Sequence, residues 1–439
     1  MMSCVMLSYI VFDKLVKKSL FFLSALTLGV QAANAGYLVN FGDPKAASFQ
    51  EAISKQNVHI VQFGDSHTAG DTMTEALRER LQSVLGKGGM GWAMPMYFSG
   101  QRMARFGYDN KNFSPVSSRT VQSGDYTAGG LIARPNGLGA TLTLKAKQAE
   151  PMQKMLVSIK QAPSDGKFTV TDASGRMINI EVPHKNNTWQ LVSFDAKLPI
   201  TIYNDGARNT DIGGWWALSA TGSGATVSAI GINGAELSHW SRWNKNAWQS
   251  ELGKISPNLV VLAYGTNEAY NNVSAETVRS VLTQKIREVR QATPRSAILV
   301  LGAPESLRST SGGCGTRPNN LTAIQYAQRE VAQNERTLYW DWQGAMGGNC
   351  SMKSWINSGR ASKDGVHFSA VGYTALGQIL ADDLLSFGRL GGQPYVPTTP
   401  TVSHGGQIKP DPIPINIPKN HGSGFISQPN GNGRIFIRE

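Results

Sequence analysis

The feature that most constrains the fold is an alternation of short apolar runs with longer amphipathic segments. Four apolar runs are typical of strands buried on both faces of a sheet: 57–63, 259–264, 297–302 and 338–342. Four amphipathic segments predict helices: 72–85, 275–292, 321–334 and 370–387. Because strands that alternate with helices form parallel sheets covered on both faces, we expect a three-layer α/β/α domain with a parallel sheet.

The first apolar run ends in Gly64-Asp65-Ser66, directly before a helix. Sites in such sheets lie at the carboxyl ends of the strands, so Ser66 is a candidate nucleophile if a base reaches it. Asp364 and His367 are separated by two residues on what we interpret as a loop before the last predicted helix. This spacing allows the carboxylate to orient the imidazole, and we predict a Ser-His-Asp triad.

Two further blocks lie between these motifs, each after an apolar run: Gly-Ile-Asn-Gly-Ala at 231–235 and Tyr-Gly-Thr-Asn-Glu at 264–268. In this order the four blocks resemble the SGNH/GDSL hydrolase superfamily. The resemblance implies that His367 is the base, that Asp364 orients it, and that Ser66, Gly234 and Asn267 donate to the oxyanion. Such preorganised donors stabilise the charge on an attacked ester carbonyl by about 3 kcal/mol each.

A narrower resemblance rests on the longer blocks at 64–71, 88–92, 100–102 and 265–269. The broad superfamily commonly has leucine where this chain has His67 and aspartate where it has Glu268. Both variants occur in a narrower group that the longer blocks resemble, the peptidoglycan O-acetylesterases of Gram-negative bacteria. The likeness covers most of residues 37–388. It implies a serine esterase without a cofactor, which removes acetyl from the C6 hydroxyl of N-acetylmuramic acid through acetyl-serine and so permits cleavage by lytic transglycosylases.

Residues 104–228 differ in composition and hydrophobic pattern from the rest of the chain. Short runs rich in Thr, Ser, Val and Ile alternate with turn pairs such as Asp165-Gly166, which predicts a β-sandwich. Because the motif blocks that contain Ser66 and Gly234 flank it, the sandwich is an insertion between hydrolase segments 36–103 and 229–390. The resemblance implies a fold like that of carbohydrate-binding modules. Three tryptophans there are either sugar-stacking faces or core residues: Trp189, Trp215 and Trp216.

Residues 1–35 have the layout of a secretory signal with cleavage before Gly36: basic residues, an apolar run at 20–30 and Ala33-Asn34-Ala35. The run is too short for an ordinary membrane span, and the alternative is an uncleaved N-terminal anchor. Removal takes away three lysines and one aspartate, so the net charge of +12 falls by two to +10. We therefore expect a protein of the periplasm of a Gram-negative bacterium, with no membrane insertion beyond the signal.

The remaining cysteines, Cys314 and Cys350, are an even pair in glycine-rich segments. In an oxidising compartment they predict a disulfide, and the alternative is two unpaired thiols. No ligand pair accompanies His184 or His239, so no metal site is expected.

A basic chain with a pI of about 9.5 suits an anionic partner such as peptidoglycan. Nucleic acid is not expected, because no Lys/Arg cluster, RNP-like aromatic pattern or zinc finger occurs.

Several further residues lie in or near the predicted motifs. His67 adjoins the nucleophile, but neighbouring side chains diverge at a helix start, so we expect it to line the pocket or pack locally. Arg102 either touches substrate or is a surface charge. Gly86 to Gly91 has the spacing of a dinucleotide loop but follows a helix, so we interpret it as a loop near the rim of the active site. Trp240, Trp243 and Trp248 are expected in the core.

Residues 391–439 are rich in Pro and Gly and predict an extended tail, whose final Ile-Phe-Ile is a candidate edge strand.

Three other functions remain open at this point. An O-acetyltransferase would use the same acetyl-enzyme, a wall-binding protein would carry an inactive hydrolase domain, and a lipase or thioesterase is possible within the superfamily.

Overall fold

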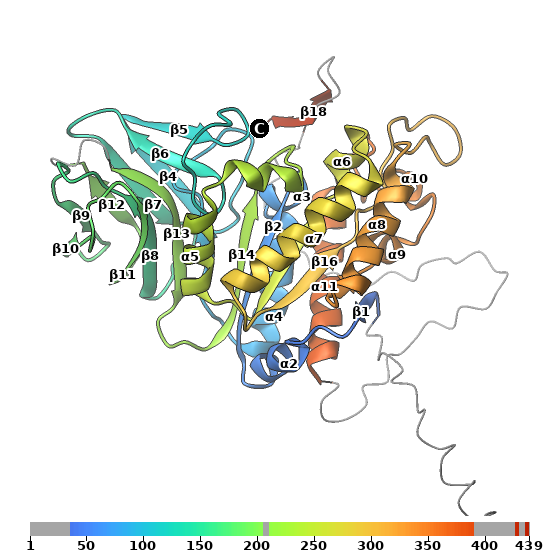
Figure 1. Ribbon diagram of the computed structural model, residues 1–439, viewed down its shortest axis with the longest axis horizontal. Helices are drawn as coiled ribbons and strands as arrows, with labels where there is room; N and C mark the ends of the chain where they lie inside the picture. Colours follow the sequence, from blue (N-terminus) through green and yellow to red (C-terminus); the bar gives the residue numbers. More distant parts are fainter. Residues whose placement is uncertain (1–35, 205–209, 390–425, 430–434, 439) are drawn as a thin grey trace, which may run out of the picture. The chain divides into compact units, whose positions relative to one another are not determined.

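The computed structural model describes residues 36–204, 210–389, 426–429 and 435–438 (Figure 1). The predicted signal at 1–35 and most of the predicted tail at 391–439 lie outside the described residues. Two short strands of the tail pair as an antiparallel hairpin: β18 (Ile426–Pro429) and β19 (Ile435–Arg438).

The hydrolase part is built on a six-stranded sheet in the order β1-β17-β16-β15-β2-β14. The five strands from β17 to β14 are parallel to one another, whereas β1 pairs with β17 in the antiparallel sense. The sheet is therefore mixed, and the prediction of a wholly parallel sheet is wrong at this edge. The strands are β1 (Leu38–Asn40), β2 (Asn57–Gly64), β14 (Gly224–Gly231), β15 (Leu259–Ala263), β16 (Ala297–Leu301) and β17 (Leu338–Trp340).

Alternate residues of these strands bury opposite faces of the sheet. Val61 and Phe63 join one apolar cluster with residues of α5, α7 and α8. Ile60 joins another with residues of α2, α4, α10 (Ser351–Asn357) and α11. Figure 1 shows α7 and α8 crossing the near face of the sheet. The three layers of helix, sheet and helix are thus present. The long helices are α2 (Ala46–Ser54), α4 (Thr72–Leu85), α5 (Lys245–Ile255), α7 (Ala275–Ala292), α8 (Leu321–Asn334) and α11 (Ala370–Arg389).

Two antiparallel sheets form the inserted β region, in the orders β10-β9-β12-β7-β4 and β11-β8-β13-β6-β5, and β3 also pairs with β13. Leu142 and Ile202 of the first sheet share one buried cluster with Val157 and Ile212 of the second. The strands are β3 (Gly91–Ala93), β4 (Phe106–Lys111), β5 (Phe113–Ser117), β6 (Leu131–Pro135), β7 (Thr141–Ala146), β8 (Gln153–Lys160), β9 (Phe168–Thr171), β10 (Met177–Ile180), β11 (Trp189–Ala196), β12 (Ile200–Tyr203) and β13 (Asp211–Ser219).

The tryptophans of the inserted region are wholly or partly buried. Trp215 and Trp216 are 0% exposed, so they are core residues and offer no face to a sugar. Trp189 is half-buried: its indole donates to the carbonyl of Asp125 at 2.9 Å, and the Lys160 Nζ lies 5.3 Å from its ring centroid.

The cluster that fills the inserted region continues into the hydrolase part. Val61 and Phe63 of β2 belong to the same cluster as Val157 of β8. The predicted insertion at 104–228 also includes the first residues of β14, which pairs in parallel with β2 and is a hydrolase strand. Conversely β3, predicted within the first hydrolase segment, pairs with β13. The two parts are therefore joined through a common core, and the predicted domain limits do not follow sheet membership at these two points.

The glycine-rich segment 86–91 does not lie at the rim of the active site. Lys87 forms a parallel bridge with Ala225 near the beginning of β14, whereas the site lies where the parallel strands end. A Cβ at Gly88 would come within 2.4 Å of the Ala225 carbonyl oxygen. The glycines permit close backbone approach to β14, so the rim placement is wrong.

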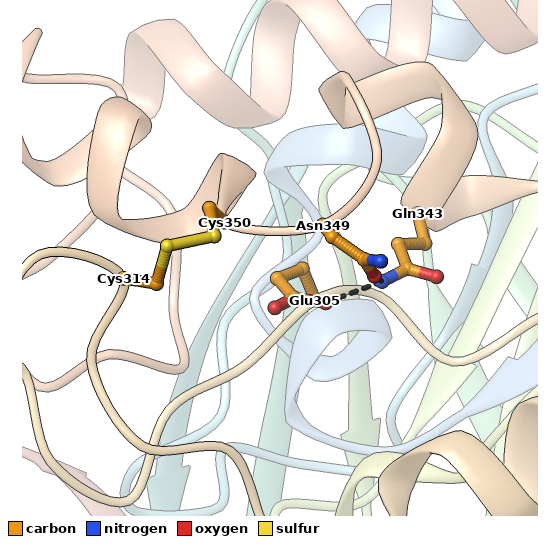
Figure 2. Close-up of a disulfide and its surroundings, with 5 residues drawn as sticks. All are labelled: Glu305, Cys314, Gln343, Asn349 and Cys350. Carbon is orange, nitrogen blue, oxygen red and sulfur yellow. Dashed lines mark hydrogen bonds between the residues drawn. A yellow bond between two sulfur atoms is a disulfide. The ribbon is translucent and has the colours of Figure 1, made fainter.

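Cys314 and Cys350 are joined as a disulfide with an S–S distance of 2.00 Å (Figure 2). Cys314 lies on the segment between β16 and α8, and Cys350 directly precedes α10. Glu305 lies beside this link, where its Oε2 accepts a 2.5 Å hydrogen bond from Gln343 Nε2 (Figure 2). Short helical turns complete the fold: α3 (Ser66–Ala69), η1 (Leu237–Arg242), α6 (Thr266–Tyr270), α9 (Trp342–Met346) and α10 (Ser351–Asn357).

Candidate active site

A tight turn at the end of β2 positions Ser66. The side chain of Asp65 caps α3 by accepting a 3.0 Å hydrogen bond from the His67 backbone N–H. A Cβ at Gly64 would come within 2.1 Å of Thr68 Oγ1 and 2.8 Å of a carbonyl on β15, so only glycine fits before the turn. The hydroxyl of Ser66 therefore lies at the first residue of a short helix, at the carboxyl edge of the sheet.

The structure brings together the three residues of the predicted triad. His367 Nε2 lies 3.0 Å from Ser66 Oγ, and His367 Nδ1 lies 2.8 Å from Asp364 Oδ2. Asp364 Oδ1 also accepts hydrogen bonds from the backbone N–H groups of Val366 and His367, at 2.8 and 3.0 Å. This chain of contacts orients the imidazole so that it can accept the hydroxyl proton.

The environment keeps Asp364 ionised. Burial raises the pKa of the Asp364 carboxyl, but the side-chain hydrogen bond and charge of His367 and the two backbone donors lower it more, so that the net pKa lies below the usual value. An ionised Asp364 favours the protonated imidazole that forms when His367 takes a proton.

The residues predicted to hold the oxyanion line the same cavity as Ser66 and His367. Ser66, Gly234, Asn267 and His367 all line a cavity of about 100 Å³. Gly234 lies three residues beyond the end of β14 and has a φ of +67°, in the left-handed region that favours glycine. The Asn267 side-chain amide donates to the Ala235 carbonyl at 3.1 Å, which fixes the amide beside the glycine.

Two buried carboxyl groups lie behind these donors. Burial raises the pKa of Asp65 to about 8 and that of Glu268 to about 7. Glu268 Oε1 accepts from the Leu237 backbone N–H and Oε2 from the Gly265 backbone N–H, both at 2.9 Å. Glu268 thus fastens the segment after Gly234 to the turn that carries Asn267. Sequence reasoning noted Glu268 only as a departure from the superfamily, although its place directly after Asn267 was the available signal.

His67 packs beneath the site, as predicted. Its Nδ1 lies 2.9 Å from the Tyr373 hydroxyl, and its ring is surrounded by Trp342, Phe368 and His367 at centroid distances of 5.3, 5.6 and 5.5 Å. Burial first, and then the neighbouring His367, lower the pKa of His67 to about 3. A neutral His67 held by this aromatic group is suited to support the imidazole of His367 rather than to replace it.

Sequence reasoning missed part of the pocket wall. Arg119 and Gln122 from the inserted region, and Arg242 and Glu236 from the hydrolase region, line the cavity around Ser66. Arg102, which was a candidate for substrate contact, is exposed and is not among the lining residues. The three tryptophans Trp240, Trp243 and Trp248 are buried, as predicted.

Across residues 36–204 and 210–389, no group of three or more His, Cys, Asp or Glu side chains has an arrangement suited to a metal ion. Among the helices in the described part of the chain, none combines the length and the apolar character required to span a bilayer.

The comparisons with known proteins agree with this architecture. The model of the family "Peptidoglycan O-acetylesterase, N-terminal" matches residues 88–201. A solved structure of a peptidoglycan O-acetylesterase is 39% identical, with a TM-score of 0.74, over 81% of this chain and 100% of the other. The chain belongs to the peptidoglycan O-acetylesterase family. It is accordingly an esterase of the GDSL type, since the GDSL-like Lipase/Acylhydrolase family matches residues 200–375.

Other solved structures are more distant. A protein from Bacillus subtilis is 13% identical, with a TM-score of 0.31 over 62% of this chain and 88% of its own. An acetyl-xylooligosaccharide esterase from Geobacillus is 15% identical, with a TM-score of 0.29 over 37% of this chain and 73% of its own. No curated protein sequence matches the chain. Ser66 lies before both matched ranges, whereas Gly234, Asn267, Asp364 and His367 lie within the second.

Proposed function

We propose that this protein is a periplasmic serine esterase that removes acetyl from the C6 hydroxyl of N-acetylmuramic acid in peptidoglycan. The observation that carries the proposal is the 3.0 Å contact of Ser66 Oγ with His367 Nε2, in a chain that belongs to the peptidoglycan O-acetylesterase family. The identity of the sugar as muramic acid and the position of the acetyl group at C6 are inferred from the family resemblance.

In the first half-reaction, His367 takes the Ser66 proton while Oγ attacks the acetyl carbonyl carbon. The charge that forms on the carbonyl oxygen is held by the backbone N–H groups of Ser66 and Gly234 and by the Asn267 amide. His367 then gives its proton to the sugar oxygen as the ester bond breaks. The deacetylated sugar leaves, and the acetyl group remains on Ser66.

In the second half-reaction, His367 takes a proton from a water molecule that attacks acetyl-Ser66. The same donors hold the second oxyanion, and His367 returns the proton to Ser66 Oγ as acetate leaves. Asp364 stabilises the imidazolium in both steps and itself remains ionised.

Three features support a periplasmic location. Residues 1–35 have the composition of a secretory signal. The disulfide between Cys314 and Cys350 is of the kind that persists in oxidising compartments. The net positive charge suits an anionic wall polymer.

Removal of the acetyl group would free the C6 hydroxyl of the muramic acid. Lytic transglycosylases use that hydroxyl in their cleavage chemistry, so the proposed role is to make glycan strands cleavable. We further propose that the inserted β region acts as a module of the carbohydrate-binding type.

Acetate release from O-acetylated peptidoglycan by the mature protein, with Ser66→Ala as the comparison, tests this function. We expect acetate from the wild type and at least about a thousandfold less from Ser66→Ala, the range seen when triad members are removed. A soluble muropeptide included in the assay detects a transferase, which would yield acetylated acceptor in place of acetate. Neither acetate nor acetylated acceptor from the wild type would indicate a wall-binding protein.

A further inference from the structure

Tyr270 lies between the two groups of residues that the proposed chemistry needs. It ends α6, three residues after the proposed oxyanion donor Asn267, and both line the same cavity as Ser66 and His367. Side chains three residues apart on a helical turn are neighbours on one side of it. The phenol ring therefore belongs to the oxyanion side of the cavity, whereas its hydroxyl contacts a distant segment of the chain.

The Tyr270 hydroxyl is connected to the loop of the catalytic base. It donates a 2.6 Å hydrogen bond to the carbonyl of Leu307, on the segment between β16 and α8. Leu307 is buried, and its own backbone N–H donates to the Gly365 carbonyl at 2.7 Å. Gly365 lies between Asp364 and His367 in the chain. Two hydrogen bonds through one residue thus join the oxyanion side to the acid–base loop.

Close packing makes this connection stiff. A Cβ at Gly365 would lie 2.7 Å from the Leu307 carbonyl oxygen and 3.1 Å from the Leu307 Cβ, so the loop rests directly on Leu307. Val366, the next residue, is buried and lines the cavity. Because the interior is close-packed, a shift of Leu307 would displace the backbone donors that hold Asp364.

Arg308 fixes the same segment against Tyr270. Its guanidinium donates to the Tyr270 carbonyl, and its Cζ lies 5.2 Å from the centroid of the phenol ring. The backbone N–H of Arg308 donates to the Thr316 carbonyl at 2.7 Å, two residues after the disulfide-bonded Cys314. Segment 307–316 is therefore a braced support that contacts Tyr270 through both its side chain and its backbone.

The surroundings keep the Tyr270 hydroxyl protonated. Burial first, and then the charge of Asp364, raise the pKa of this hydroxyl above its usual value. The hydroxyl therefore remains a donor to Leu307 over the whole neutral range and is poorly suited to exchange a proton with substrate. Its contribution to the site is geometric.

We propose that Tyr270 is a positioning residue, which acts through Leu307 to fix the loop of Asp364 and His367 relative to the oxyanion donors. His367 must reach the nucleophile while the attacked carbonyl oxygen stays beside the donors. The distance between these two segments therefore decides how well the transition state is held. The inference rests on the serine mechanism of the proposed function and adds one residue to it.

Tyr270→Phe removes the hydroxyl and keeps the ring in the cavity wall. We expect kcat to fall by about tenfold to a hundredfold with little change in KM, because the substrate still binds but the reacting groups are held less precisely. The loss should be similar for O-acetylated muropeptide and for 4-nitrophenyl acetate, since both esters use the same reacting groups. Tyr326→Phe is the matched control: it removes an exposed hydroxyl from α8 and should keep wild-type kinetics.

Proton NMR separates positioning from a general loss of stability. The proton on His367 Nδ1, which lies 2.8 Å from Asp364 Oδ2, gives a downfield signal when it is hydrogen-bonded to the carboxylate. We expect this signal to move or broaden in Tyr270→Phe and to stay unchanged in Tyr326→Phe, with a thermal melt to show that each variant is folded. A folded Tyr270→Phe with the wild-type signal or the wild-type kcat would overturn the inference.

The two substrates distinguish positioning from substrate contact. A loss confined to the muropeptide, with a raised KM, would make Tyr270 a substrate-contacting residue and overturn the positioning role. Failure of the proposed function gives a different result: the wild type would hydrolyse 4-nitrophenyl acetate but not the muropeptide. The kcat of Tyr270→Phe on 4-nitrophenyl acetate would still decide the inference in that case.

Discussion

The backbone N–H of Leu237 donates a 2.9 Å hydrogen bond to the carboxyl group of Glu268, 31 residues further along the chain. The second oxygen of Glu268 accepts from Gly265. These two contacts join the segment that carries Gly234 to the turn that carries Asn267. The proposed oxyanion donors therefore depend on a buried carboxyl group that takes no part in the proposed chemistry.

Substitution of Glu268 by alanine is expected to lower kcat more than it raises KM. The Leu237 and Gly265 N–H groups lose their acceptor, so the donors at Gly234 and Asn267 are less well fixed for a charge that develops only in the transition state. We expect a loss of about tenfold to a hundredfold in kcat, measured by steady-state hydrolysis of 4-nitrophenyl acetate. An unchanged kcat in a folded variant would show that Glu268 does not position the donors.

Glu268 also predicts a pH dependence of stability. Its pKa is raised to about 7 in the folded protein from 4.5, so the folded state binds the proton more readily than the unfolded state does. The stability that this group contributes is present below about pH 4.5 and is lost as the pH rises towards 7. Relative to Glu268→Gln, the wild type should lose on the order of 1–3 kcal/mol of its free energy of unfolding between these pH values.

Urea titrations of the two proteins at matched pH values measure this difference. Burial, and to a smaller extent the charge of Glu268, raise the pKa of Asp65 to about 8, so the comparison reports Glu268 together with its effect on Asp65. A difference between wild type and Glu268→Gln that does not vary with pH would contradict the assignment of the raised pKa to Glu268.

His67 and His367 are expected to respond differently to substitution. His67→Phe keeps an aromatic ring among Trp342, Phe368 and Tyr373 but removes the ring nitrogens, so we expect activity within about tenfold of the wild type. His367→Ala removes the group that contacts Ser66 and should lower kcat by about 10³-fold or more. Esterase assays on both variants decide the identity of the base, and the opposite order of effects would make His67 the base.

Asp364→Asn tests the role of the Asp364 charge toward His367 and leaves a side chain of similar size in the site. Asparagine preserves the shape of the side chain but removes the charge that favours the imidazolium, so kcat should fall by about 10²- to 10⁴-fold with little change in KM. A pre-steady-state assay with 4-nitrophenyl acetate follows the acylation step directly. Acylation at the wild-type rate would argue against a role for the Asp364 carboxylate.

The disulfide is expected to stabilise the fold. It closes a loop with a sequence separation of 36 residues, and the chain-entropy model gives about 3–4 kcal/mol for a loop of that length. The double variant Cys314→Ser with Cys350→Ser should therefore unfold at lower urea concentration than the oxidised wild type. Treatment of the wild type with a reductant is the matching control, and equal stability of all three forms would contradict this contribution.

The periodic spacing of apolar residues predicted many of the helices and strands of the hydrolase region. The helices at 72–85 and 321–334 have their predicted bounds because their apolar positions recur at helical spacing. The helix at 275–292 begins after the predicted cap, where Ser274 accepts from the Thr277 N–H. The triad geometry followed from the rule that sites gather where parallel strands end.

Other features depend on tertiary contacts that the local sequence does not encode. The antiparallel strand β1 is three residues long and carries too little pattern to be recognised. The glycines at 86–91 were misplaced because close approach to another strand gives the same composition as a loop. Arg119 was missed because nothing near position 119 indicates that its loop reaches Gly234, which lies across the boundary between the two parts of the chain.

The central claim is that Ser66 carries the acetyl group during turnover. Rapid acid quenching after the protein is mixed with O-acetylated muropeptide, followed by mass spectrometry of the peptide that contains Ser66, tests this claim directly. We predict one acetyl group on Ser66 in the wild type, longer-lived in Asp364→Asn, and none in Ser66→Ala. Acetate release by the wild type at full rate, with no acetylated Ser66 at any quench time and with the same rate in Ser66→Ala, would contradict the account.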